Sequence, residues 1–199
     1  MSTNLPDTPL PAAPPADAPL FQRTDQSALY PYTRREYARR LAWELVRATL
    51  FRWSPRRAYG WRLWLLRVFG ARIGPNAGVR PTTRVFYPWL LTLGQRSILG
   101  DGVDVYNLGP VEIGEHTVVS QGTYICGGTH DYTRPDLPLV RAGVRIGRGV
   151  WIAAQAFIGP GVCIGDNSVI GARAVVVGDI PPGVVAAGNP ARVIKPRIP

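Results

Sequence analysis

Hydrophobic side chains recur at every sixth position through a long stretch of this chain. From residue 146 onward the recurring residues are β-branched: Ile146, Ile152, Ile158, Ile164, Ile170 and Val176. A six-residue period fits neither an α-helix nor an ordinary strand. It is typical of a β-solenoid, in which each hexad forms one short strand and a turn, and three hexads close one coil. We therefore predict triangular coils, stacked roughly 4.8 Å apart, with these residues inside them.

Two other positions of the hexad also carry the same kind of residue in successive repeats. Glycine directly follows four of the aliphatic residues, at Gly147, Gly159, Gly165 and Gly171. We expect glycine here because the corner of a coil can require a positive φ. A small or aliphatic residue stands two places before each aliphatic one, at Val150, Ala156, Val162, Ser168 and Ala174. These side chains should pack beside the aliphatic column.

The repeat also runs earlier in the chain, with breaks in its phase. It can be followed through Ile73, Val79, Val85, Leu93, Leu99, Val105, Ile113, Val119 and Ile125. Between Ile125 and Ile146 the phase slips by three residues, so residues 127–143 cannot all lie in the coil. This stretch is polar and interrupted by prolines, which predicts a surface loop. One of only two histidines, His130, lies in it.

Residues before the repeat predict a tail and two helices. Residues 1–33 are rich in Pro and Ala, and we expect a disordered tail followed by an extended lead-in. Over 34–70 we predict an arginine-rich cap, whose first helix groups its apolar residues opposite Arg40, Glu44 and Arg47. That group is Ala42, Leu45, Val46, Thr49, Leu50 and Trp53. The second helix should begin at Ser54-Pro55, end at Gly70 and carry the apolar residues Trp61, Trp64, Leu65 and Val68. The solenoid then spans 71–180, and 181–199 is a C-terminal segment.

The positive charge is concentrated in the helical cap. The chain has a net charge of +10, and the span from Arg34 to Arg72 holds eleven arginines and two glutamates, leaving +1 for all other residues. One interpretation is structural, because amphipathic helices cover the open end of a solenoid. The other is a membrane-surface or anionic-substrate patch, since arginine and tryptophan together are typical of interfacial helices. Nucleic acid is disfavoured, because no recognised nucleic-acid module accompanies the charge.

Composition limits the class of protein further. A chain of 199 residues with 46% hydrophobic content is sufficient for one domain with a core. Cys126 and Cys163 have neither metal-type spacing nor a disulfide framework, which favours a reducing compartment. The first 22 residues contain no Lys or Arg, and no uncharged apolar run approaches roughly 20 residues. We therefore expect a cytoplasmic protein, with peripheral contact to the inner membrane as the second interpretation of the arginines.

Several motifs accompany the hexads. They are Tyr87-Pro88-Trp89, Val105-Tyr106-Asn107-Leu108, Gly128-Thr129-His130-Asp131-Tyr132, Pro135-Asp136, Val150-Trp151-Ile152-Ala153, and the ending Ala186-Ala187-Gly188-Asn189-Pro190-Ala191-Arg192-Val193-Ile194. Together they resemble the hexapeptide-repeat acetyltransferases of the left-handed β-helix superfamily. Within it, the chain resembles the colanic-acid branch near the maltose and nodulation-factor O-acetyltransferases. The left hand is implied by this resemblance alone, because the usual crossover rule predicts the opposite. The resemblance also implies a homotrimer, with acetyl-CoA in the groove between adjacent subunits.

Acetyl transfer to a hydroxyl needs a general base, and the resemblance assigns this role to His130. Asp131 could orient the imidazole or bond to loop amides, and the sequence leaves both open. Asp104, Asn107 and Tyr132 are similar to the acceptor-binding side of the family site, although an Asx role in a turn fits the first two equally well. His116 fits a polar corner residue better than a catalytic one. A covalent mechanism through Cys126 is disfavoured, because nothing in the sequence lowers its thiol pKa.

The resemblance also places the donor, acetyl-CoA. Backbone groups near Ala154 and Ala172, one coil apart, would bind the pantetheine arm beside Trp151. Arg192 and Lys195 would meet the phosphates, and Lys195 is the only lysine in the chain. The family usually carries Thr-Lys-Asp or a similar run where this chain has Val177-Gly178-Asp179. One phosphate contact of the family would therefore be lost here, or Arg173 would supply it.

The sequence therefore predicts an acetyl-CoA-dependent O-acetyltransferase for a sugar hydroxyl of a polysaccharide or lipid-linked glycan precursor, by direct transfer in a ternary complex. An N-acetyltransferase for an amino sugar or nucleotide sugar is the enzymatic alternative. A non-catalytic, membrane-associated scaffold is the alternative of a different class. A zinc enzyme on the same solenoid, such as a γ-class carbonic anhydrase, needs three histidines, so we predict no metal.

Overall fold

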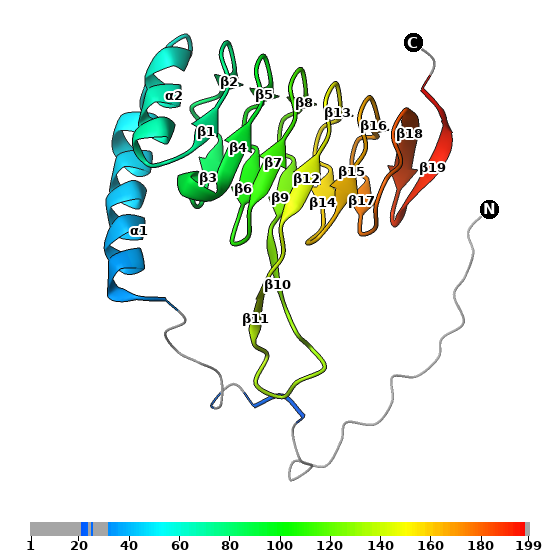
Figure 1. The fold of residues 1–199 in the computed structure, drawn as a ribbon, viewed down its shortest axis with the longest axis horizontal. Coiled ribbons are helices and arrows are strands. Elements are labelled where there is room, and N and C mark those ends of the chain that lie inside the picture. Colours follow the sequence, from blue (N-terminus) through cyan, green and yellow to red (C-terminus); the bar gives the residue numbers. More distant parts are fainter. Residues whose placement is uncertain (1–20, 24, 26–31, 198–199) are drawn as a thin grey trace, which may run out of the picture.

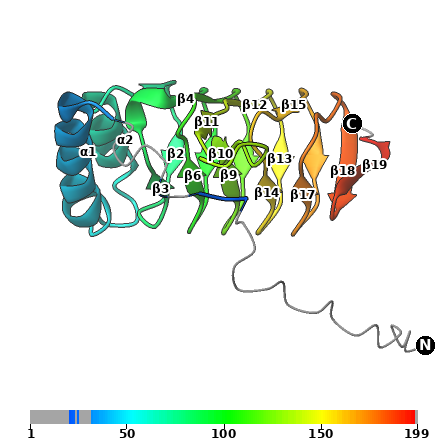
Figure 2. The same ribbon diagram turned by 90° about the horizontal axis from the view of Figure 1, so that it is seen from below.

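Each hexad folds into a strand of two or three residues, and three strands in sequence complete one turn of a parallel β-helix (Figure 1). The computed structural model describes residues 21–23, 25 and 32–197. Most of the predicted N-terminal tail lies outside the described residues. Two helices stand at the N-terminal end of the β-helix, and a long hairpin projects from its side (Figures 1 and 2).

Three parallel sheets form the faces of the prism. Sheet A contains β1 (Arg72–Ile73), β4 (Leu91–Leu93), β7 (Val111–Ile113), β12 (Val144–Ile146) and β15 (Cys163–Ile164). Sheet B contains β2 (Gly78–Val79), β5 (Ile98–Leu99), β8 (Val118–Val119), β13 (Trp151–Ile152), β16 (Val169–Ile170) and β18 (Val184–Gly188). Sheet C contains β3 (Arg84–Val85), β6 (Asp104–Tyr106), β9 (Tyr124–Cys126), β14 (Phe157–Ile158) and β17 (Val175–Val176). We call the corners between these sheets the AB, BC and CA edges.

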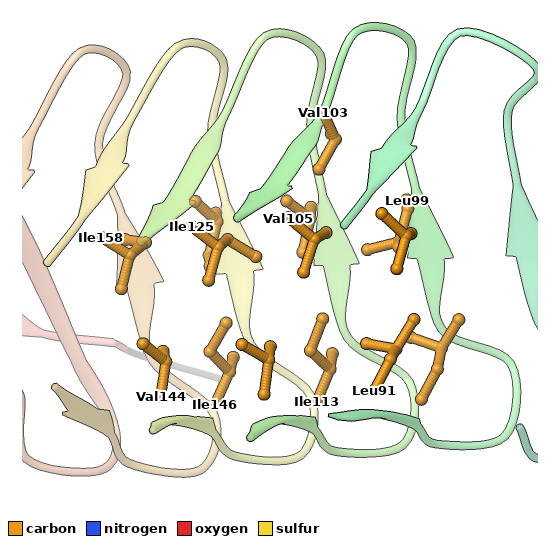
Figure 3. Close-up of a cluster of buried hydrophobic side chains, with 14 of the residues drawn as sticks. Leu91, Leu99, Val103, Val105, Ile113, Ile125, Val144, Ile146 and Ile158 are labelled. Carbon is orange, nitrogen blue, oxygen red and sulfur yellow. The ribbon is translucent and has the colours of Figure 1, made fainter. Parts of the chain in front are cut away.

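The hexad residues fill the interior as predicted. Ile146, Ile152, Ile158, Ile164, Ile170 and Val176 are each at most 2% exposed. Equivalent residues of successive coils pair in register, so that Ile125 stands over Ile158, and Ile158 over Val176. Figure 3 shows the resulting columns of aliphatic side chains between the sheets. The apolar surface removed from water along these columns is the main source of stability for so narrow a fold.

The glycines of the hexads serve a different purpose from the one we predicted. Gly147, Gly159, Gly165 and Gly171 do not have positive φ; the left-handed backbone falls two residues later, for example at Gly149, Asn167 and Arg173. A β-carbon at Gly165 would lie 2.7 Å from the Cα of Pro182 in the next coil. Glycine is therefore required because neighbouring coils approach closely at the corner, and not because of its backbone conformation.

The first helix, α1 (Arg34–Val46), begins at a capping box between Thr33 and Glu36 and continues into a π-helical segment, Arg47–Phe51. Our prediction of its buried face was wrong. Leu45, Leu50 and Trp53 are exposed, while Trp43 and Phe51 are buried and their rings meet edge to face 5.9 Å apart. The indole of Trp43 donates to the carbonyl of Val85, 2.7 Å away, which fixes this side of the helix against the first coil.

The second helix, α2 (Tyr59–Val68), begins later than the Ser54-Pro55 signal suggested. The hydroxyl of Ser54 donates to the Phe51 carbonyl instead of capping a helix. Of its predicted apolar residues only Leu65 is buried; Leu63, Leu66 and Arg62 are buried with it, and Trp61, Trp64 and Val68 are exposed. α2 therefore covers the first coil with the face opposite its tryptophans.

Two hairpins complete the fold. β10 (Gly128–His130) and β11 (Leu139–Arg141) pair antiparallel and project from the CA edge (Figure 1). At the far end, β19 (Ala191–Pro196) pairs antiparallel with β18, so sheet B continues beyond the boundary that the hexads indicated at residue 180. A short 3₁₀ turn, Pro88–Leu90, connects β3 and β4. Among the described residues, neither α1 nor α2 has the length and apolar character of a membrane span.

Candidate functional site

His130 is the last residue of β10, at the point where the projecting hairpin loses its regular pairing. Its Nδ1 lies 2.7 Å from the carbonyl oxygen of Leu137, on the returning half of the hairpin. Because a carbonyl oxygen only accepts, this bond requires a proton on Nδ1. In the tautomer with this proton, the lone pair is on the other ring nitrogen, Nε2. The side chain is exposed, so Nε2 is available to take a proton from a bound substrate.

The backbone of the hairpin tip fixes the acceptor of this bond. Leu137 has a φ of 44°, in the left-handed region that a leucine rarely adopts. The amide of Leu137 donates to the carbonyl of Arg134, and the amide of Asp131 donates to that of Pro138. Backbone strain of this kind is maintained only where surrounding contacts fix it, and it is frequent at functional sites. The tip therefore orients the His130 ring through a carbonyl.

Asp131 does not contact the imidazole. Its Oδ1 accepts from the amide of Thr133 at 3.0 Å and from the Thr133 hydroxyl at 2.6 Å, forming a local Asx turn. These bonds, the hydroxyl first, hold the pKa of the Asp131 carboxyl below its usual range. Of the two roles that the sequence left open, the structure supports the bond to loop groups. Tyr132, next to it, is 81% exposed.

The hairpin contacts the N-terminal helix through Tyr32. The guanidinium of Arg40, on α1, lies 4.2 Å from the Tyr32 ring centroid, and that of Arg141, on β11, lies 5.1 Å from it. Arg40 also stands near the rings of Tyr37 and Tyr87. A pocket of about 350 Å³ opens between α1 and sheet C beside this cluster; its lining is Tyr37, Arg40, Leu41, Glu44, Phe86 and Tyr87.

The outer face of sheet C is aromatic and leads toward the hairpin. Successive rings of Phe86, Tyr106, Tyr124 and Phe157 lie with centroids 4.7, 6.1 and 5.8 Å apart. Burial raises the pKa of Tyr124 to about 12, so its phenol stays protonated at neutral pH. The row makes the outer face of sheet C aromatic, with Tyr124 and Phe157 stacked and Phe86 and Tyr106 edge to face.

Asp104 stands on the same face. Its Oδ2 lies 3.4 Å from the Arg84 guanidinium, and its buried Oδ1 has no hydrogen-bond partner among the described residues. Burial raises the pKa of its carboxyl, against the opposing effect of Arg84. The Asp104 side chain is only 18% exposed, so a substrate hydroxyl can approach its carboxyl only through this small exposed part.

Asn107 is fully buried and does not face the substrate side. Its Oδ1 accepts from the amide of Tyr87 at 2.9 Å, and its Nδ2 donates to the carbonyl of the same residue at 2.6 Å. The Asn107 amide thus bonds both backbone groups of Tyr87, as a neighbouring strand would. In this geometry it positions the 3₁₀ turn rather than touching an acceptor.

The residues expected to bind the pantetheine arm lie at the BC edge. Ala154 follows β13 and Ala172 follows β16, in equivalent corners of adjacent coils, and the amide of Arg173 donates to the Ala154 carbonyl. Among the described residues, the amides of Ala154 and Ala172 have no hydrogen-bond partner. Trp151 is half exposed on sheet B, and its indole donates to the Ser120 hydroxyl. A row of free amides along an edge can bind the carbonyl groups of an extended ligand.

Of the predicted phosphate contacts, two reach this edge. Arg173 occupies the corner itself, and its Nε donates to the Gln155 side chain. Arg192 pairs with Ala187, directly before the corner at Gly188. Lys195 pairs with Val185, three residues further along β19, or roughly 10 Å away. The structure therefore groups Ala154, Ala172 and the two arginines, and separates Lys195 from them.

A single chain does not bring His130 and the BC edge together. His130 projects from the CA edge, and the whole width of sheet C separates the two. His116 lies at the third edge, AB, in a left-handed turn with a φ of 56°, near Glu115 and Arg148. Cys126 ends β9, and its thiol donates to the Gly128 carbonyl, not to His130.

Sequence reasoning missed two features of the site. The Leu137 carbonyl has no signature, because it depends on backbone conformation alone. The pocket beside Arg40 combines residues more than 40 positions apart, and only the packing of α1 on the first coils brings them together. Within the described ranges, His, Cys, Asp and Glu side chains form no group of three that could share a metal ion.

This chain is similar in sequence to known acetyltransferases. The bacterial transferase hexapeptide (six repeats) family matches residues 143–178. The putative colanic acid biosynthesis acetyltransferase WcaF of Escherichia coli is 46% identical over 156 residues, which cover 78% of this chain and 86% of that relative. The galactoside O-acetyltransferase of the same organism is 34% identical over 134 residues, 66% of each chain.

Solved structures agree with these relatives. A galactoside acetyltransferase in complex with coenzyme A superposes with a TM-score of 0.77 at 29% identity, over 85% of this chain and 86% of the other. A maltose O-acetyltransferase from Clostridium difficile 630 superposes with a TM-score of 0.75, also at 29% identity, over 84% and 90%.

Proposed function

Since this chain belongs to the hexapeptide-repeat acetyltransferases, we propose that it transfers an acetyl group from acetyl-CoA to a hydroxyl of a sugar. Its β-helix is the left-handed one of that family, as the resemblance implied. Membership makes the chain an acetyltransferase and sets aside the non-catalytic scaffold. The acceptor we propose is a polysaccharide or a lipid-linked glycan precursor, supported by the similarity to a relative named for colanic acid biosynthesis.

The orientation of His130 is the observation that carries this proposal. With Nδ1 donating to Leu137, Nε2 takes the proton from the acceptor hydroxyl as the oxygen attacks the thioester carbonyl. A C–O bond forms, the C–S bond breaks, and the proton passes to the departing sulfur of coenzyme A. Donor and acceptor are bound together, so the acetyl group moves directly and Cys126 takes no part.

Acetyl-CoA binds along the BC edge. The free amides of Ala154 and Ala172 suit the carbonyl oxygens of the pantetheine arm, and the half-exposed indole of Trp151 offers it an apolar surface. Arg173 and Arg192 are the cations within reach of the phosphates from this edge. Lys195 contributes a longer-range charge rather than a direct contact.

The complete site is formed by two subunits of a homotrimer. The separation of His130 from the BC edge within one chain supports this arrangement, because each copy offers one half of the site on a different edge. A threefold assembly repeats the same heterologous contact three times and closes on itself. Three equivalent sites result.

The acceptor lies over the aromatic face of sheet C. Ring faces of Tyr106 and Tyr124 suit the apolar faces of sugar rings, and the partly exposed carboxyl of Asp104 suits a hydroxyl donor. Tyr132, exposed beside His130, can reach the same substrate. Asn107 supports the site from beneath by holding the Tyr87 turn.

We test the proposal with acetyl-CoA consumption over a panel of sugars, amino sugars and glycan intermediates. Replacing His130 with Ala should lower turnover by roughly 10²- to 10⁴-fold, the usual contribution of a general base. His116→Asn is the matched control, because asparagine also tolerates the left-handed backbone there, and it should keep wild-type turnover. Equal turnover of His130→Ala and wild type would reject His130 as the base. Faster reaction with amino groups than with hydroxyls would favour the N-acetyltransferase.

A further inference from the structure

The helices at the N-terminal end carry two apolar faces, and only one of them is buried. The face packed on the first coil holds Trp43, Phe51, Leu63 and Leu66. The opposite face leaves six large apolar side chains 41–81% exposed: Leu45, Leu50, Trp53, Trp61, Trp64 and Val68. We call these six residues the cap face. Three exposed tryptophans on so short a segment are unusual for a surface that faces only water.

Several residues of the cap face touch one another. The rings of Trp61 and Trp64 stack with centroids 5.1 Å apart. The indole of Trp61 donates to the carbonyl of Leu50 at 3.0 Å, which links α2 to the preceding segment. Val68 stands one helical turn beyond Trp64 and therefore extends the same stripe. Trp61, Trp64 and Val68 are thus part of one apolar patch rather than scattered surface residues.

The segment that carries the cap face is rich in arginine and has few acidic residues. Between residues 34 and 72 the only acidic residues are Glu36, which is used in the capping box, and Glu44, which bonds to Arg47. Arg52 and Arg57 are exposed and form no ion pair among the described residues. The segment therefore combines exposed tryptophans with a net positive charge.

This charge decides between the partners that could cover the patch. A second copy of the same face would bring like charges together, which opposes association. An anionic membrane surface attracts the guanidinium groups, while indole rings lie favourably at the boundary of headgroups and acyl chains. We infer that the cap face binds the surface of a membrane containing anionic phospholipid.

The position of the patch suits such a contact. Both helices stand at one end of the β-helix, opposite the closing strands β18 and β19 (Figures 1 and 2). In the proposed homotrimer, with the three β-helices parallel, the symmetry axis directs all three cap faces toward the same plane. Three weak contacts then act together on one surface. The inference itself does not depend on the trimer or on the acceptor.

The test is flotation of the full chain with vesicles. We expect binding to vesicles that contain phosphatidylglycerol at low salt, loss of binding at high salt, and none with phosphatidylcholine alone. Two double variants, Trp61→Ser with Trp64→Ser and Arg52→Gln with Arg57→Gln, should each reduce the bound fraction by about fivefold or more. Val177→Ser and Arg145→Gln remove an exposed apolar side chain and an exposed arginine elsewhere, and should bind as wild type does.

Both double variants should retain acetyl transfer to a soluble sugar. This activity separates the membrane contact from catalysis. Three results would overturn the inference. The first is no flotation with anionic vesicles at low salt. The second is equal binding by wild type and the tryptophan double variant. The third is self-association of the wild type that this variant abolishes, which would make the cap face an interface between copies.

Discussion

At the scale of single residues, the orientation of one imidazole depends on one backbone carbonyl. His130 donates through Nδ1 to Leu137, whose left-handed backbone turns its carbonyl toward the ring. The sequence identified His130 because the loop interrupts the hexads, but it could not identify its partner. A backbone carbonyl has no residue type, and the conformation that directs it arises only when β10 and β11 pair.

Asp131→Asn tests this assignment. The amide oxygen of asparagine can still accept from Thr133, so the Asx turn and the hairpin tip should persist. We expect turnover within about threefold of wild type, measured as acetyl-CoA consumption, since the carboxylate does not orient the ring. A loss comparable to that of His130→Ala, with the thermal unfolding unchanged, would instead make Asp131 the partner of the imidazole.

At the scale of elements, the spacing of the coils restricts the corners more than backbone conformation does. A β-carbon at Gly165 would meet the backbone of Pro181 and Pro182 in the next coil, whereas one at Gly178 would meet no atom within 4 Å. Neither glycine has a positive φ. The periodicity predicted where glycine stands, but the reason is a distance between coils that no single hexad contains.

The two glycines form a matched pair for measurement. Gly165→Ala should lower the free energy of unfolding by about 2 kcal/mol or more, because backbone of the adjacent coil must shift. Gly178→Ala should change it by no more than about 1 kcal/mol, in either direction. Chemical denaturation of both variants gives the comparison. Equal, small effects would show that the corners are not restricted by the neighbouring coil.

The helical cap is attached to the solenoid by a buried arginine. Arg62 is fully buried and donates to the carbonyls of Val79, Pro55 and Arg56 and to the hydroxyl of Ser54, at 2.6–2.8 Å. Its burial lowers the pKa of the guanidinium. The amphipathic pattern suggested that arginines lie outside and tryptophans inside. Here Trp61 and Trp64 lie outside and Arg62 lies inside, whereas Arg57 and Arg67 are exposed. Arg62 is buried because the segment before α2 presents carbonyls that only a multiple donor can satisfy.

Replacing Arg62 with Met should therefore destabilise the cap strongly. Four acceptors lose their donor inside the protein, and we expect a loss of about 3 kcal/mol or more in the free energy of unfolding. Arg57→Met, at an exposed position, should stay within about 0.5 kcal/mol of wild type. Limited proteolysis between residues 54 and 58 should also become faster in Arg62→Met only. Two indistinguishable variants would contradict this role for Arg62.

At the scale of the whole molecule, the three edges of the prism divide the chemistry. The imidazole projects from the CA edge, and free amides and arginines line the BC edge. The hexads predicted the prism, because each position of the repeat has a fixed direction. They could not show that the two halves of the site face away from each other in one chain, since this depends on where the hairpin leaves the coil.

Complementation between two inactive variants measures most directly whether neighbouring subunits share the site. His130→Ala removes the base, and Ala172→Trp blocks the exposed BC edge; each should form trimers that are inactive alone. When equal amounts are reassembled together, about a quarter of the contacts join an intact His130 to an intact BC edge. We predict about a quarter of wild-type turnover in the mixture. A mixture that forms mixed trimers and remains inactive would contradict a site shared between subunits.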